Sequence, residues 1–121
     1  MRRRLLLFLG PLCAVAAWAG DAMPATEKRR VERLILYVES RTDVAFVRNG
    51  TDYTSRDAAD FLRKKMDYMG DRVTTAQQFV DMIASKSSTS GEPYMIKHAD
   101  GRTEHSAKFL GDELKRMDAG R

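Results

Sequence analysis

Four segments of the chain repeat apolar residues three and four positions apart, the spacing of one buried face of a helix. The first helix is predicted from about Glu27 to Ser40, with basic residues on its solvent side. Gly70 is expected to end the second helix in the left-handed conformation. Hydroxyl residues that precede the helices are expected to cap them, since they accept hydrogen bonds from a first turn. The predicted caps are Thr26, Thr54, Thr74 and Ser106, and the predicted core positions are Val31, Leu34, Ile35, Val38, Ala58, Phe61, Leu62, Met66, Met69, Ala76, Phe79, Val80, Ile83, Phe109, Leu110, Leu114 and Met117.

Residues 44–53 form a predicted β-hairpin. Asn49-Gly50 is typical of a two-residue type I′ turn, in which both central residues have positive φ. That turn places Phe46 opposite Tyr53, an aromatic pair on one face of the hairpin. Arg48 lies beside the turn on the same face, and we expect its head to close over the edge of the core.

Residues 94–105 form a second predicted hairpin around Asp100-Gly101. A two-residue turn there sets Lys97 opposite Glu104 and Ile96 opposite His105. The predicted order of elements is therefore αββααββα. We expect one small α+β domain in which the two hairpins form one antiparallel or mixed sheet, packed by four helices. Each helix that follows a hairpin contains Phe-Leu, which hints at an internal duplication.

The first 19 residues have the pattern of a secretory signal peptide. Arg2 to Arg4 form a basic region, Leu5 to Ala16 an apolar region, and Ala17-Trp18-Ala19 the small-x-small cleavage pattern. Cleavage is predicted between Ala19 and Gly20. The alternative is a retained membrane anchor, but the apolar run is shorter than the roughly 20 residues that span a bilayer and Gly10-Pro11 interrupts it. We therefore expect the signal to be cleaved and no membrane span to remain. The predicted organisation is a signal peptide (1–19), a mobile leader (20–25), one domain (26–118) and a tail (119–121), located in the periplasm.

Removal of the signal changes the charge and the cysteine count. The whole chain has 21 Lys and Arg against 17 Asp and Glu, but three of the arginines lie in the signal and leave 18 against 17. A nearly neutral domain gives no argument for a nucleic-acid partner. The one cysteine, Cys13, leaves with the signal, so the domain must hold together without a disulfide.

Residues 85–92, S-K-S-S-T-S-G-E, contain no apolar side chain. Burying them would strand hydroxyl and backbone groups without partners, so we expect a surface loop between Ile83 and Tyr94. One interpretation is local: hydroxyls bond nearby backbone and Gly91 permits the bend. The other is recognition of a polar partner. The candidate binding residues are Lys86, Ser87, Ser88, Ser90, Tyr94 and Arg48.

His98 and His105 are the two histidines, and the predicted register puts them on one face of the second hairpin. Zinc takes three or four ligands, and no third ligand has an evident spacing, so we expect no metal and no cofactor. The serine-rich stretch lacks the motifs of serine nucleophiles and of phosphate loops. A small hydrolase with a histidine base and a nucleophile from this stretch is the alternative function.

The motifs of the chain resemble those of a known family. V-E-S before the first hairpin, F-V-R-N-G within it, T-A-x-x-F, and I-A-S-K-S-S-x-S-G-x-P-Y are similar to the small exported bacterial proteins grouped as domain of unknown function 5329. The resemblance implies one domain, a Gram-negative envelope location and no assigned activity. It also implies cysteines in many members at the positions of Val44 and His98; if they pair there, the two hairpins lie side by side in one mixed sheet.

The leading functional hypothesis is a non-enzymatic binding module of the envelope, whose partner is an envelope protein or a cell-wall component.

Overall fold

The computed structural model describes residues 23–120; the predicted signal peptide and its cleavage site at Ala19 and Gly20 lie outside them. Met23 packs against the core, and the first helix begins two residues later. The elements, in order, are α2 (Ala25–Ser40), β1 (Ala45–Arg48), β2 (Thr51–Tyr53), α3 (Ser55–Met69), the 3₁₀ turn η2 (Gly70–Arg72), α4 (Ala76–Gln78), the π-helical η3 (Phe79–Ile83), β3 (Met95–Lys97), β4 (Thr103–His105) and α5 (Ser106–Ala119). The predicted αββααββα order is confirmed.

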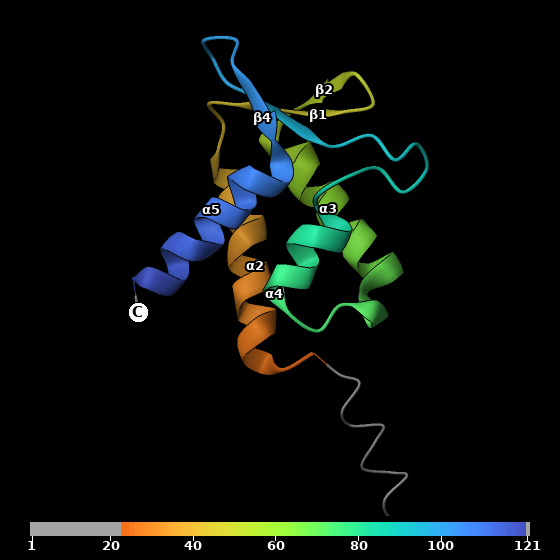
Figure 1. Ribbon diagram of the computed structural model, residues 1–121, viewed down its shortest axis with the longest axis vertical. Coiled ribbons are helices and arrows are strands. Elements are labelled where there is room, and N and C mark those ends of the chain that lie inside the picture. Colours follow the sequence, from red (N-terminus) through yellow and green to blue (C-terminus); the bar gives the residue numbers. More distant parts are fainter. Residues whose placement is uncertain (1–22, 121) are drawn as a thin grey trace, which may run out of the picture.

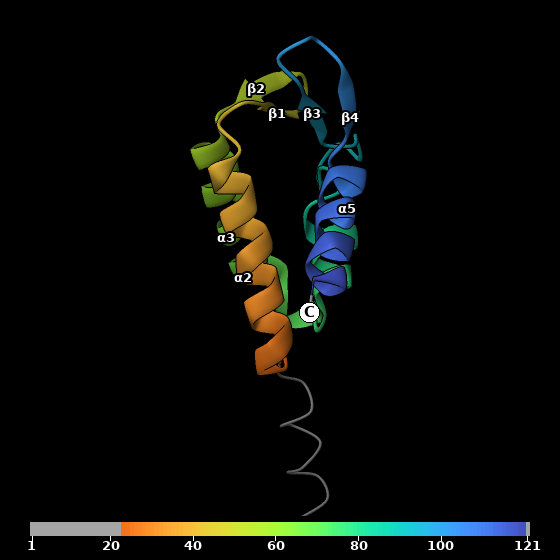
Figure 2. The same ribbon diagram turned by 90° about the vertical axis from the view of Figure 1, so that its left-hand side faces the viewer.

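The two hairpins form one four-stranded antiparallel sheet in the order β2-β1-β3-β4. The sheet lies across one end of the helices, as Figures 1 and 2 both show. The central strands β1 and β3 join the hairpins, with Phe46 opposite Ile96 and Ala45 opposite Lys97. Val44 and His98 are the next opposite positions in this register. The expectation of hairpins lying side by side is confirmed, and every pairing is antiparallel.

The predicted register of the first hairpin is confirmed, with Phe46 opposite Tyr53 and Arg48 opposite Thr51. Both turn residues have positive φ, 50° at Asn49 and 80° at Gly50. This is the conformation that a type I′ turn requires.

The predicted register of the second hairpin is wrong by one residue. Glu104 lies opposite Ile96, not Lys97, because the turn has three residues: the N–H of His98 donates to the carbonyl of Arg102 at 2.8 Å. Gly101, at φ +92°, supplies the left-handed residue of such a loop. A slip of one residue moves every side chain of β4 to the opposite face.

The core lies between the helices and the inner face of the sheet. Of the predicted core positions, Phe61, Met66 and Met69 are partly buried against the core and the others are buried. Phe79 and Ile83, the first and last residues of η3, are fully buried in the core. The π-helical turn is closed by the N–H of Ala84, which donates to the carbonyl of Phe79, five residues earlier. No helix among residues 23–120 is long and apolar enough to cross a membrane.

One of the four predicted helix caps is confirmed: Thr54 accepts a hydrogen bond of 3.1 Å from the N–H of Asp57. Thr26 lies inside its helix because the carbonyl of Pro24 already accepts the N–H of Lys28. The third cap is one residue away from its predicted place, since Thr75 accepts from the N–H of Gln78.

The final helix has no side-chain cap. Ser106 is its first residue, and its N–H donates to the carbonyl of Tyr94 at 2.9 Å, so β4 runs directly into α5. The prediction for Gly70 is also wrong: its φ is −70°, because the chain continues into the η2 turn rather than reversing in the left-handed conformation.

Candidate functional site

The turn of the first hairpin and the serine-rich stretch lie against each other. The side-chain amide of Asn49 makes two hydrogen bonds to this stretch. Its Nδ2 donates to the hydroxyl of Ser87 at 3.4 Å, and its Oδ1 accepts from the hydroxyl of Ser90 at 2.6 Å. These contacts join segments about 40 residues apart in the sequence. They bring the candidate Arg48, next to Asn49, close to the candidate serines.

Ser87 is the hydrogen-bonding centre of the serine-rich loop, and the prediction that this whole stretch lies at the surface is wrong at this residue. Its side chain is buried, at 4% relative exposure. Its hydroxyl accepts from the N–H groups of Thr89 and Ser90, and its backbone bonds Gly91 and Glu92. A buried hydroxyl is tolerated here because it has several partners. Ser87 therefore fits the interpretation in which hydroxyl groups of residues 85–92 bond the backbone of their own loop.

The other loop candidates are exposed: Lys86, Ser88 and Ser90. Lys86 forms an isolated backbone bridge to Pro93, and its backbone carbonyl accepts a hydrogen bond from the buried ammonium group of Lys65. The hydroxyl of Ser88 lies 3.6 Å from the sulfur of Met69. The loop thus presents small polar groups to solvent from a hydrogen-bonded frame.

Lys65 of α3 joins the loop to the residue before β3, and it is not among the residues predicted from the sequence. Its ammonium group donates to the Lys86 carbonyl and to the Tyr94 hydroxyl, both at 2.9 Å. The side chain is buried at 8% relative exposure, and neither acceptor carries a negative charge. The helical spacing of the sequence indicates that Lys65 is buried, because it follows the buried Leu62 by three positions and so lies on the same face of the helix.

The electrostatics of this pair follow from burial. Burial lowers the pKa of Lys65, and the positive charge of Arg48 lowers it further. Burial raises the pKa of Tyr94, with Arg48 acting in the opposite direction. A buried cation held only by neutral oxygens, with a second cation nearby, is the kind of perturbed group that is frequent at functional sites.

Arg48 and Tyr94, both candidates from the sequence, line the same cavity of about 290 Å³. It is open to solvent between the first hairpin and α3. The other lining residues are Phe46, Val47, Tyr53, Asp57, Ala58, Asp60, Phe61, Leu62, Lys64, Met95 and Ser106. Most of this wall is apolar or aromatic, and its charged groups are few, as in sites for small ligands.

The guanidinium of Arg48 is held by aromatic rings rather than by a carboxylate. Its central carbon lies 4.5 Å from the ring centre of Phe61 and 5.1 Å from that of Tyr53. It also donates to the Tyr53 hydroxyl at 3.0 Å. The expectation that this side chain closes over the edge of the core is confirmed. The two rings hold the guanidinium in place without neutralising its charge.

The two histidines do not share a face. His98 Nε2 lies 2.5 Å from Glu104 Oε2, and its ring packs edge-on against Phe109. His105, on the opposite face of the hairpin, is exposed at the start of α5. Between residues 23 and 120, neither histidine bonds the serine-rich loop, and no cluster of three or more His, Cys, Asp and Glu is placed to hold a metal ion.

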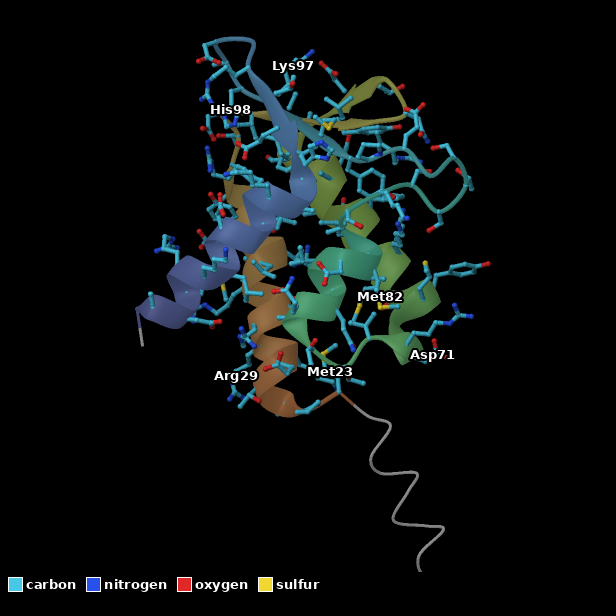
Figure 3. All side chains as sticks on the ribbon, viewed as in Figure 1. Met23, Arg29, Asp71, Met82, Lys97 and His98 are labelled. Carbon is cyan, nitrogen blue, oxygen red and sulfur yellow. The ribbon has the colours of Figure 1, made fainter. Side chains whose placement is uncertain are left out.

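A second and more open cavity, of about 980 Å³, lies at the opposite end of the molecule between α2 and α3. Met23, Arg29 and Asp71 belong to its wall, and Figure 3 shows them far from Lys97 and His98 at the sheet. None of the candidate residues from the sequence lines it.

Comparison with known proteins extends over the whole described domain. The sequence model of the Family of unknown function (DUF5329) matches residues 25–118. The chain belongs to this family. Within it, the chain is 33% identical over 94 residues to the uncharacterized protein YfeK of Salmonella typhimurium strain LT2, covering 78% of this chain and 77% of that protein. No solved structure matches. The family membership brings no assigned activity, and no comparison supports the hydrolase hypothesis.

Proposed function

We propose that this DUF5329 protein is an exported, non-enzymatic binding module of the periplasm, and that the Arg48 cavity is its binding site. The partner is an envelope protein or a cell-wall component that places a polar group against Arg48. The observation that carries the proposal is the guanidinium itself, which is stacked on Phe61 and Tyr53 at an open cavity and forms no ion pair within residues 23–120.

The serine-rich loop supports the cavity in this proposal. Lys65 fixes Tyr94 in the cavity wall and holds the loop by the Lys86 carbonyl. Asn49 ties the hairpin turn to Ser87 and Ser90. Ser90, which is exposed, thereby lies against the turn that follows Arg48.

Export is tested by the intact mass of the protein isolated from the periplasm. We expect a chain that begins at Gly20, because the small-x-small pattern ends at Ala19. A chain that retains Met1 to Ala19 and stays in the cytoplasm contradicts the location.

Binding is tested by photo-crosslinking in intact cells. A photoreactive residue replaces Lys64, an exposed residue of the cavity wall, or Lys115, an exposed residue of α5 that does not line it. We expect a discrete envelope product from position 64 that disappears when Arg48→Gln is added. Equal products from both positions, or a product insensitive to Arg48→Gln, contradict the proposed site.

A further inference from the structure

The chemistry of the cavity indicates which group its ligand carries. A guanidinium has five N–H donors in one plane. That of Arg48 gives one of them to the Tyr53 hydroxyl, and its central carbon lies over the rings of Phe61 and Tyr53. The remaining donors have no protein acceptor within the described residues. A planar pair of N–H groups held in this way matches the two oxygens of a carboxylate.

The charge balance points in the same direction. The positive charge of Arg48 lowers the pKa of Lys65, and the bonded partners of Lys65 are neutral. Asp57 and Asp60 also line the cavity, but neither forms an ion pair with Arg48 or Lys65. A negative charge bound at Arg48 relieves the repulsion between the two cations, so the cavity gains from an anion.

The rest of the wall sets the body of the ligand. Phe61 and Tyr94 meet edge to face at 5.9 Å, and Ala58, Leu62 and Met95 continue the apolar surface. A volume of about 290 Å³ encloses a group the size of one large amino-acid residue. An aromatic or branched apolar group buries well against this wall.

We propose that the Arg48 cavity binds a carboxylate attached to an aromatic or branched apolar group. The inference rests on the proposed binding function and names the chemistry of its partner. A phosphate dianion is disfavoured relative to a carboxylate, because Asp57 and Asp60 on the same wall repel its larger negative charge more strongly. The carboxylate has two sources: the C-terminal residue of a peptide or a free organic acid.

Calorimetry on the purified protein tests the proposal with three probes. N-acetylphenylalanine stands for the end of a peptide, 3-phenylpropanoate for a free acid, and N-acetylphenylalaninamide is the neutral control. We expect at least one carboxylate to bind about tenfold or more tightly than the amide, because charge-assisted hydrogen bonds to Arg48 are lost with the charge. Tighter binding of N-acetylphenylalanine indicates a peptide end, and tighter binding of 3-phenylpropanoate indicates a free acid.

Variants locate the binding. Arg48→Lys keeps the charge but loses the planar pair of donors, and we expect about a tenfold loss of affinity for the preferred carboxylate. Arg102→Gln, in the exposed turn of the second hairpin, is the matched control and leaves the affinity unchanged. If Arg48→Lys does not fold, NMR of the unsubstituted protein replaces it: the preferred carboxylate shifts the ring signals of Phe61 and Tyr94 and raises the pKa of Lys65.

Equal affinities for the acids and the amide, or shifts confined to other residues, overturn the carboxylate assignment. The crosslinking experiment separates this failure from that of the proposed function. Capture at position 64 without carboxylate binding means that the module binds a partner of different chemistry. Carboxylate binding without capture means that the site binds a small molecule and the envelope partner is wrong.

Discussion

The carboxylate of Glu27, in the first turn of α2, accepts a hydrogen bond of 2.8 Å from the backbone N–H of Ala76 at the start of α4. The same carboxylate is paired with Arg30, which in turn reaches Asp118 near the end of α5 at 2.6 Å. One acidic residue thus satisfies a helix N-terminus 49 residues away and links three helices at the end opposite the sheet.

Glu27→Gln is expected to lower the free energy of unfolding by about 1 kcal/mol at pH 7, because the amide cannot pair with Arg30. The Ala76 N–H is the largest cause of the lowered pKa of Glu27, Arg30 adds to it, and burial opposes both. A lowered carboxylate pKa contributes stability above its ordinary value of 4.5, and this is lost as the pH falls through the folded-state value. Urea titrations should show the difference from the unsubstituted protein shrinking below pH 4.5. Glu32→Gln, which removes the exposed pair with Arg63, serves as control and changes little.

Lys65→Met tests the buried ammonium group by the pH dependence of stability. Because the folded-state pKa of Lys65 is lowered, the unfolded chain binds more protons in the window between that value and 10.5, and stability rises with pH there. The variant lacks this rise, while the opposite effect of Tyr94 is present in both proteins. Between pH 7 and 10.5, the free energy of unfolding of the unsubstituted protein, measured by urea denaturation, should therefore rise relative to that of Lys65→Met. Lys64→Met, on the exposed side of the helix, should follow the unsubstituted protein; parallel curves for Lys65→Met contradict the assignment.

Ser87→Ala should destabilise the protein by about 1–2 kcal/mol, since the N–H groups of Thr89 and Ser90 and the Asn49 amide all lose an acceptor. Ser88→Ala, at the exposed neighbouring position, should change stability by less than about 0.5 kcal/mol. Faster amide exchange at Thr89 and Ser90 in Ser87→Ala alone identifies the loss as local. Because Ser87 is needed for the loop to fold, a test of binding by this loop leaves Ser87 in place and changes the exposed Lys86 and Ser88 to alanine.

Three glycines have different expected costs. Gly50→Val and Gly101→Val should each cost more than about 1 kcal/mol, because φ values of +80° and +92° are strained for a β-branched residue. Gly111 lies within α5, and a Cβ there meets nothing within 4 Å. Gly111→Ala should stabilise the protein by about 0.5–1 kcal/mol, since glycine is a poor helix former. Thermal melts rank the three; a neutral Gly101→Val means that the three-residue turn is wrong.

The helices and the first hairpin were predictable because local rules determine them. Apolar spacing locates the buried faces of the helices, and Asn49-Gly50 admits one favoured turn. The length of the second turn was not predictable from the sequence, because a glycine such as Gly101 fits both a two-residue and a three-residue loop. In the register that forms, Lys97 pairs with Asp52 of the first hairpin, a contact that the local sequence does not reveal, and Glu104 lies beside His98 of its own hairpin.

The candidate site was predictable in part for the same reason. Tyr94 and Arg48 were identified from their positions beside turns and loops, and both line the cavity. Lys65 was missed because a lysine at a buried helical position acquires its role only from the Lys86 carbonyl and the Tyr94 hydroxyl, which come from elsewhere in the chain. Ser87 was taken for a surface residue because its partners are mostly backbone groups of its own loop, which composition does not reveal.

The joint between β1 and β3 sets the order in which this protein can assemble. Each hairpin closes over a few residues, but the joint pairs Phe46 with Ile96 and must wait until both have been synthesised. Until then β1, the strand that ends up in the middle of the sheet, has one edge without a partner. An unpaired edge recruits strands from other chains. The chain is therefore most prone to association while the first hairpin is formed and the second has not yet paired with it.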